Sequence, residues 1–157
     1  MADNNQPSPP DIITIAAGAV MLIAGFLAIF KIPSGFNIQT GSVTSEGQNV
    51  FGDLAFPIAT FVWLFGIVAA LQIVLTTFAN VKLPERVLDF TWSQIHLALA
   101  GFCAVVMVCW LITSDLPDKG IGFWGLLLGS IALVVGAVMR LQAAPSTAGG
   151  PTPPTTF

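Results

Sequence analysis

The ionisable residue best placed for chemistry in this largely apolar chain is His96, the only histidine. Four residues recur at i, i+4, i+7 and i+11 and would share one face of a helix: Glu85, Asp89, Trp92 and His96. Ionisable groups inside membrane segments often serve proton relays or quinone sites. His96 falls about one turn inside Trp92, so the simpler interpretation is an imidazole at the membrane interface.

Two further residue types are candidates for chemistry within apolar segments. Gln72 is strongly polar and would need a hydrogen-bond partner in hydrocarbon, such as Ser130 or a backbone carbonyl. An interhelical hydrogen bond is the simpler role, and contact with a substrate is the alternative. Cys103 and Cys109 lie about 120° apart around a helix, so they cannot pair within one straight helix, and we interpret both as small buried apolar residues.

Several kinds of chemistry are disfavoured by what the sequence lacks. No carboxylate pair lies in the apolar runs, which disfavours an ion-coupled carrier. One histidine and two offset cysteines are too few for a zinc site, and there is no Walker loop, dinucleotide fingerprint or nucleophile elbow. We therefore predict no catalytic residue, cofactor or metal. The few scattered charges, with a net charge of −3, predict no nucleic-acid partner.

Four long apolar runs must position these side chains. Each is close to the ~20 residues that a helix needs to cross a bilayer, and their apolar cores contain no Asp, Glu, Lys or Arg. Of the 157 residues, 55% are hydrophobic and 8% are charged, which leaves too little polar surface for a soluble globule. We expect an all-α membrane protein built as a bundle of four transmembrane helices, with spans at about 12–30, 57–78, 91–112 and 121–139.

The segments around these spans set the domain organisation. Residues 1–10 and 141–157 are predicted to be disordered tails that flank a transmembrane domain at 11–140. The outer loop 31–56 includes short β-prone pieces, among them Val43–Thr44 and Asn49–Phe51, that favour a small hairpin.

Helix ends are predicted from capping residues and proline. Asp11 is expected to cap the first helix, which would end at Lys31, and Pro57 is expected to begin the second. Pro84 is expected to begin the third helix, which would then continue unbroken through the interface into its membrane span. The short connection after that span predicts that the third and fourth helices are antiparallel neighbours.

The few cations indicate an orientation. Four spans place both termini on one side, together with Lys82, Arg86 and Arg140, while Lys31 and Lys119 lie on the other. The positive-inside rule therefore favours cytoplasmic termini, although the first helix taken alone argues the reverse.

A seam of small residues in the fourth run is a packing signal. Gly122, Gly129 and Gly136 recur at seven-residue steps, Gly125 completes a GxxxG motif with Gly129, and Ala132 lies on the same stripe. Small residues let helix backbones approach closely in lipid. This glycine seam predicts a close helix–helix contact, either within one bundle or with another protomer or partner subunit.

Two segments of the sequence carry a resemblance: LPERVLDFTWSQIHLALAG at residues 83–101 and GIGFWGLLLGSIALVVGAVMRLQ at residues 120–142. Together with the Pro-rich tail they resemble small four-helix membrane proteins of the actinobacterial type, most of them uncharacterised. The resemblance extends loosely over all four spans. It implies a location in the plasma membrane, and no catalytic residue can be carried over.

Three functions are open on this sequence. The first is a non-enzymatic accessory or scaffold subunit that packs with itself or with a larger membrane complex. The second is a small oligomeric transporter or channel, for which the available polar side chains are Gln72, Thr60, Thr76, Thr77 and Ser130. The third is a thiol or quinone oxidoreductase that uses Cys103, Cys109 or His96. The first is favoured, because the chemistry that the others require is missing.

Overall fold

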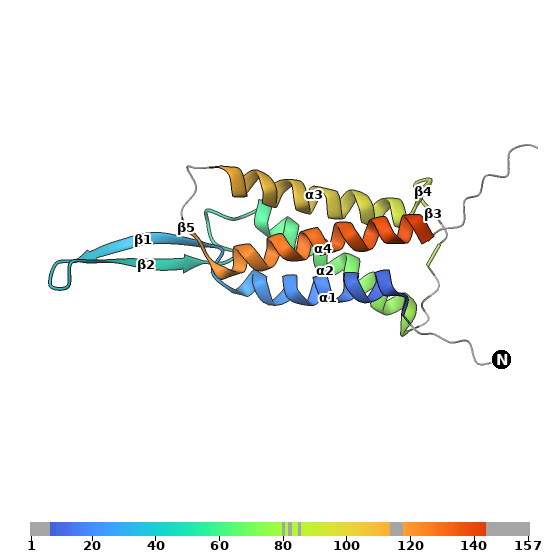
Figure 1. Ribbon diagram of the computed structural model, residues 1–157, viewed down its shortest axis with the longest axis horizontal. Helices are drawn as coiled ribbons and strands as arrows, with labels where there is room; N and C mark the ends of the chain where they lie inside the picture. The colour runs from blue at the N-terminus through green and yellow to red at the C-terminus, as the bar shows by residue number, and fades with distance from the viewer. Residues whose placement is uncertain (1–6, 80, 82, 85, 114–117, 144–157) are drawn as a thin grey trace, which may run out of the picture.

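Four helices form an elongated bundle in the computed structural model, which describes residues 7–79, 81, 83–84, 86–113 and 118–143 (Figure 1). They are α1 (Pro9–Phe26), α2 (Ile58–Thr77), α3 (Trp92–Ile112) and α4 (Ile121–Ala143). Each is long and apolar enough to cross a membrane, which confirms the number of helices predicted from the four apolar runs. The tails predicted to be disordered lie largely outside the described residues.

The helices form a ring in which α1 lies between α2 and α4, and α4 lies between α1 and α3. Neighbouring helices run antiparallel, as predicted for α3 and α4 (Figure 1). The contact between α2 and α3, which closes the ring, is looser than the other three.

The interior of the bundle is apolar, and so is most of its outer surface. Met21, Val62, Met107 and Leu126 are fully buried along the axis. Large apolar side chains also cover the outside, for example Val105, which is 62% exposed. A soluble monomer rarely exposes an apolar surface of this extent, whereas a bundle surrounded by hydrocarbon requires one.

A β-hairpin extends from one end of the bundle, along its long axis (Figure 1). Strand β1 (Phe30–Asn37) pairs antiparallel with β2 (Ser42–Gln48), and the short β5 (Asp118–Lys119) pairs with the base of β1. Gly41 adopts a φ of 64° in the connecting turn. We call this end of the bundle the hairpin end and the other the opposite end.

The hairpin corrects the all-α prediction and the end of the first helix. α1 ends at Phe26 instead of at residues 30–31, because Ile29 donates its backbone N–H to the carbonyl of Gln48 and Phe30 enters β1. Lys31 is therefore a strand residue. The hairpin lies in the predicted loop. Of the two pieces predicted to be β-prone, Val43–Thr44 is part of β2, whereas Asn49–Phe51 lies in a turn after that strand.

The start of α1 also differs from the prediction. The helix begins at Pro9, with Ser8 as its N-cap, and Asp11 lies at the third helical position. The carboxylate of Asp11 accepts the backbone N–H of Ser8 at 3.0 Å, which is the reciprocal half of a capping box. Asp11 therefore supports the cap without being the capping residue.

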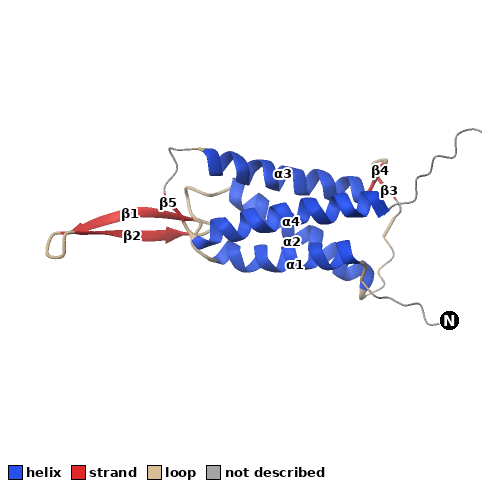
Figure 2. Cartoon of the chain, in the orientation of Figure 1, coloured by secondary structure: helices blue, strands red, loops and turns tan. Residues whose placement is uncertain are grey.

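The predicted unbroken helix from Pro84 is wrong. Two short strands, β3 (Arg86–Val87) and β4 (Phe90–Thr91), pair across a turn in which Leu88 and Asp89 have φ angles of 51° and 65° (Figure 2). Asp89 and His96 consequently do not share a helix face, and the predicted polar stripe does not form. Glu85 lies outside the described residues.

A capping box sets the start of α3. The Thr91 hydroxyl accepts the backbone N–H of Gln94, and the Gln94 side chain accepts the backbone N–H of Thr91 at 3.0 Å. Thr-x-x-Gln is a signature of a helix start that sequence reasoning missed here. It places His96 in the second turn of α3, close to the opposite end of the bundle.

Candidate functional site

Three side chains from three helices meet at the opposite end of the bundle. The Arg140 guanidinium, in the last turn of α4, donates through Nη2 to Asp11 Oδ1 of α1 at 2.5 Å. Its Nη1 lies 2.8 Å from His96 Nδ1 of α3. We call Asp11, His96 and Arg140 the Arg140 clasp. It ties α1, α3 and α4 together at one level of the bundle.

The clasp is shielded from solvent. His96 is only 4% exposed, and the side chains of Arg140 and Asp11 are 20% and 21% exposed. The second carboxylate oxygen of Asp11 is already engaged, because it accepts hydrogen bonds from the backbone N–H and the hydroxyl of Ser8. Asp11 is therefore held by its own helix while it pairs with α4, as a charge in a partly buried place requires.

The hydrogen bond to Arg140 fixes the protonation state of His96. A guanidinium group has donors and no acceptor, so His96 Nδ1 must be the acceptor. His96 is then neutral, with its proton on Nε2. The Trp92 ring lies beside it, with ring centroids 6.5 Å apart, and the Trp92 indole donates to the carbonyl of Pro84 at 2.8 Å.

Gly136 allows the helices that carry Asp11 and Arg140 to approach each other closely. A Cβ atom at this position would lie 2.5 Å from Thr14 Oγ1 and 3.3 Å from the Pro10 carbonyl. The missing side chain lets the first turn of α1 approach α4 closely, one helical turn before Arg140. Thr14 is buried there and donates to the Pro10 carbonyl at 2.9 Å, so its hydroxyl is satisfied within α1.

These three residues are separate features of the sequence, and no pattern in it predicts that they meet. Arg140 is 129 residues from Asp11 and 44 from His96. The position of each residue along the bundle axis would have indicated the clasp. In a bundle of four antiparallel helices, the start of α1, the start of α3 and the end of α4 lie at the same end. Each of those three termini carries one of the ionisable groups.

The rest of the glycine seam faces α1 inside the bundle. A Cβ atom at Gly122 would lie 2.7 Å from the carbonyl oxygens of Ala24 and Leu27, and one at Gly125 would lie 2.6 Å from the Ala24 Cβ. One at Gly129 would overlap the Met21 side chain. The seam was predicted to pack either within one bundle or against another protein. The contacts of Gly122, Gly125 and Gly129 are with α1 of the same bundle.

Ala132 lies at the outer edge of the α1–α4 contact. It lines a groove of about 350 Å³ on the outer face of the bundle, with Ile13 and Ala16 of α1 and Leu128 of α4 among the other residues around it. The groove is apolar and has no charged residue in its lining, so it offers packing for an apolar chain and no chemistry.

Gln72 does not bond to Ser130, which was one of the two partners expected for it. The Ser130 hydroxyl donates instead to the carbonyl of Leu126 in its own helix, at 2.7 Å. Gln72 Oε1 is buried and has no hydrogen-bond partner among the described residues. A buried acceptor without a partner costs about 1–3 kcal/mol, so this amide destabilises α2 packing unless another molecule satisfies it.

The two cysteines lie on different sides of α3, since Cys103 is buried and Cys109 is exposed. Cys103 Sγ lies 3.5 Å from the carbonyl of Val62 in α2 and packs in the core, as predicted, while the exposure of Cys109 corrects the prediction that both are buried. Within the described residues, no three His, Cys, Asp or Glu side chains group closely enough to hold a metal ion.

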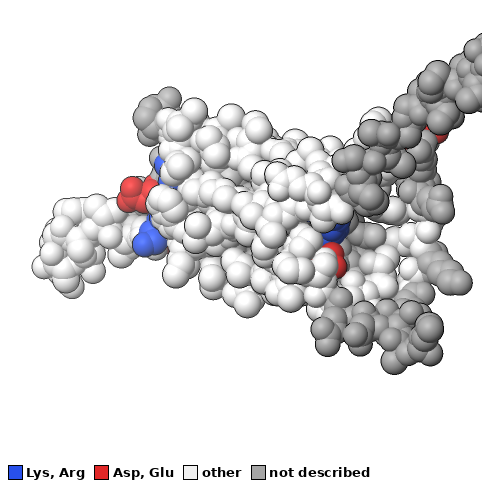
Figure 3. Space-filling view, turned by 45° about the vertical axis from the view of Figure 1, so that its right-hand side comes forward, with Lys and Arg blue, Asp and Glu red and all other residues white. Residues whose placement is uncertain are grey.

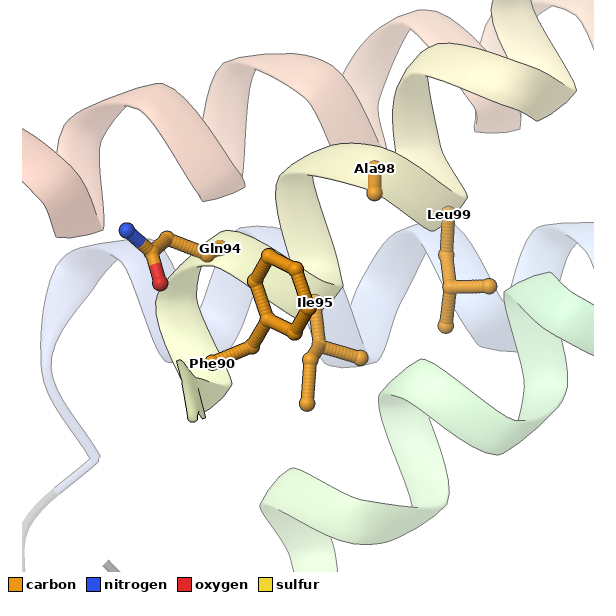
Figure 4. A pocket seen from close by; sticks show the side chains of 5 residues that line it. All are labelled: Phe90, Gln94, Ile95, Ala98 and Leu99. Atoms are coloured by element: carbon orange, nitrogen blue, oxygen red, sulfur yellow. The ribbon is translucent and has the colours of Figure 1, made fainter. Parts of the chain in front are cut away.

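A second groove of about 350 Å³ lies along the start of α3 (Figure 4). Its lining is formed by Phe90, Gln94, Ile95, Ala98 and Leu99. Figure 4 shows the apolar side chains on one side of the helix, with the Gln94 amide at one end. That amide oxygen already accepts the Thr91 N–H, so the groove presents an almost wholly apolar wall.

Comparison with known proteins adds no further information. No family model, curated protein or solved structure matches the chain.

Proposed function

We propose that the protein is a non-enzymatic, multi-pass plasma-membrane protein that acts as an accessory or scaffold subunit of a larger membrane complex, with cytoplasmic termini. The observation that carries this proposal is the β1–β2 hairpin, which extends beyond the bundle and presents an uncovered apolar face. Its occupant on this proposal is the extramembrane domain of a neighbouring membrane protein.

The distribution of charge supports insertion of the bundle in a bilayer. Figure 3 shows charged side chains near the two ends of the bundle and uncharged surface between them. This is the pattern expected when polar headgroups meet the ends and hydrocarbon covers the middle.

The apolar face of the hairpin supports a protein partner. Phe36 and Val43 are cross-strand partners and therefore point to the same face; they are 64% and 62% exposed. Ile38, in the turn beyond them, is 88% exposed. Because the hairpin follows the long axis of the bundle (Figure 1), the bilayer that surrounds the helices cannot cover this face. An exposed apolar patch outside the bilayer is typical of a protein interface.

The chemistry of the hairpin indicates what kind of surface it fits. Residues 32–45 contain no Asp, Glu, Lys or Arg. A partner would therefore need an apolar, uncharged patch. A charged group on the partner would lose its water on binding and find no opposite charge on the hairpin to pair with.

The alternative functions have less support. The hydroxyls of Thr60, Thr76 and Ser130 donate to backbone carbonyls, which leaves them little capacity to line a polar transport path. Cys103 and Cys109 face different surroundings, which does not favour a dithiol mechanism.

A matched pair of hairpin variants tests the proposal. Phe36→Asp with Ile38→Asp places charge on the apolar face, and Asn37→Asp places it on the other face while keeping the oxygen that accepts the Gln39 N–H. We expect membrane proteins that co-purify with the wild type in mild detergent to be lost from the double variant and kept by Asn37→Asp. Partners retained by both variants, or a wild type that purifies alone as a monomer, would contradict the proposal. Capture of only a second copy would indicate self-association instead.

A further inference from the structure

We propose that the Arg140 clasp is a proton-responsive contact, in which protonation of His96 releases the start of α3 from α4. The inference is independent of the proposed function, since it concerns the opposite end of the bundle from the hairpin. It rests on the arrangement of three side chains and on the way α3 is held.

Closing the clasp requires a neutral His96. In the closed state the lone pair of Nδ1 accepts a hydrogen bond from the Nη1–H of Arg140, with the two nitrogens 2.8 Å apart. A proton on Nδ1 would occupy that lone pair and set two N–H groups against each other. The hydrogen bond and the protonated imidazole therefore exclude each other.

The charges around His96 make the protonated state still less compatible with the closed clasp. Among the described residues, the charged groups that face it are Arg140 from α4 and Asp11 from α1. Residues Ile58–Thr77 of α2 and the rest of α3 contribute no charged side chain. Protonation would set two cations against one carboxylate, whose second oxygen is already bonded to Ser8.

Apart from His96, the start of α3 is only partly buried. His96 is the first buried residue of α3, and the next is Ala100, one turn further along. The helix is preceded by the β3–β4 turn, and its contact with α2 is loose. Because a buried imidazolium beside a guanidinium is unfavourable, we expect the first two turns of α3 to move until His96 reaches water or headgroups.

The first measurement reads the protonation state directly. His96 is the only histidine, so every histidine ring signal in a ¹⁵N spectrum belongs to it, provided that the protein is purified with a tag that lacks histidine. At neutral pH we expect the neutral ring with its proton on Nε2. A proton on Nδ1 in the neutral ring, or a charged ring at neutral pH, would overturn the proposal.

The second measurement reads the movement. Spin labels attached to Ala98→Cys and Val138→Cys, in a background of Cys103→Ala and Cys109→Ser, report the separation of α3 and α4 in nanodiscs. Acidification from about pH 8 to about pH 4 should reversibly shift the distance by about 2 Å or more in this background. An unchanged distance distribution would overturn the proposal.

His96→Gln is the matched control, because its amide oxygen can accept from Arg140 but does not titrate. It should keep the short distance at every pH, with a helical spectrum and thermal stability that show a folded bundle. An acid response that persists in His96→Gln would assign the proton to Asp11 and overturn the role of His96.

If His96→Gln does not fold, the titration of the His96 ring in the ¹⁵N spectrum is the deciding measurement. His96 should bind its proton over the same pH range in which the distance between the labels changes. A mismatch between the two curves would overturn the proposal.

Discussion

Gly125 and Gly101 form a matched pair for testing whether close approach of α1 and α4 stabilises the bundle. Both lie inside helices. A Cβ atom at residue 125 would lie 2.6 Å from the Ala24 Cβ, whereas one at residue 101 meets no atom within 4 Å. The same chemical change, Gly→Ala, therefore adds a clash at one position and none at the other.

The expected magnitudes follow from these contacts. Replacing glycine by alanine inside a helix gains about 0.5–1 kcal/mol of stability. Overpacking a tight contact costs about 1–3 kcal/mol, and here the obstructing atom is a methyl group fixed to the α1 backbone, which cannot rotate away. We expect Gly125→Ala to lose about 1–2 kcal/mol net, and Gly101→Ala to be unchanged or to gain up to about 1 kcal/mol.

Thermal unfolding in mild detergent, followed by far-ultraviolet circular dichroism, compares the two variants with the wild type. The unfolding midpoint of Gly125→Ala should fall and that of Gly101→Ala should stay or rise. If Gly125→Ala unfolds at or above the midpoint of Gly101→Ala, the separation of α1 and α4 is not limited by side-chain size at this position. The packing role given to the glycine seam would then be wrong.

Three further predictions concern polar and sulfur-containing side chains. Arg140→Gln should destabilise the bundle by about 1–3 kcal/mol, because it leaves the partly buried Asp11 carboxylate without its cation, and Asp11→Asn in the same protein should recover part of that loss in a melting experiment. Gln72→Leu should stabilise the protein by about 1 kcal/mol or leave it unchanged, since it removes an acceptor without a partner among the described residues; a clear loss of stability would contradict this reasoning. A Cys103→Ser, Cys109→Ser double variant should keep full function in a genetic assay, and its loss would favour the oxidoreductase alternative.

The four helices could be predicted from the sequence because run length and the absence of charge are local properties. The hairpin was predicted only in outline. Ile29 and Phe30 are apolar residues at the end of an apolar run, and nothing local separates them from α1. Phe30 enters the sheet and Ile29 leaves the helix because both contact Gln48, which lies in a segment distant in sequence.

The β3–β4 turn before α3 was missed for a different reason. Residues 84–91 have a pattern compatible with a helix, and Leu88 is an unusual residue at a positive φ. The capping box at Thr91 and Gln94 was a visible signal that competed with this pattern, and it proved decisive. The Arg140 clasp could not be read from any one segment, since it requires three helix ends to meet at the same depth.

The pairing of β5 with β1 has a mechanical consequence for the whole molecule. The backbone N–H groups of Gly120 and Gly122 donate to the carbonyls of Ile29 and Ala28 at 2.7 and 2.8 Å, so α4 is fastened to the end of α1 where the hairpin begins. At the far end of the same two helices, Arg140 is fastened to Asp11. α1 and α4 are thus joined to each other at both of their ends. A force applied to the hairpin would therefore reach the α1–α4 pair first, and the α2–α3 contact, which is looser than the other three in the ring, is the one expected to open.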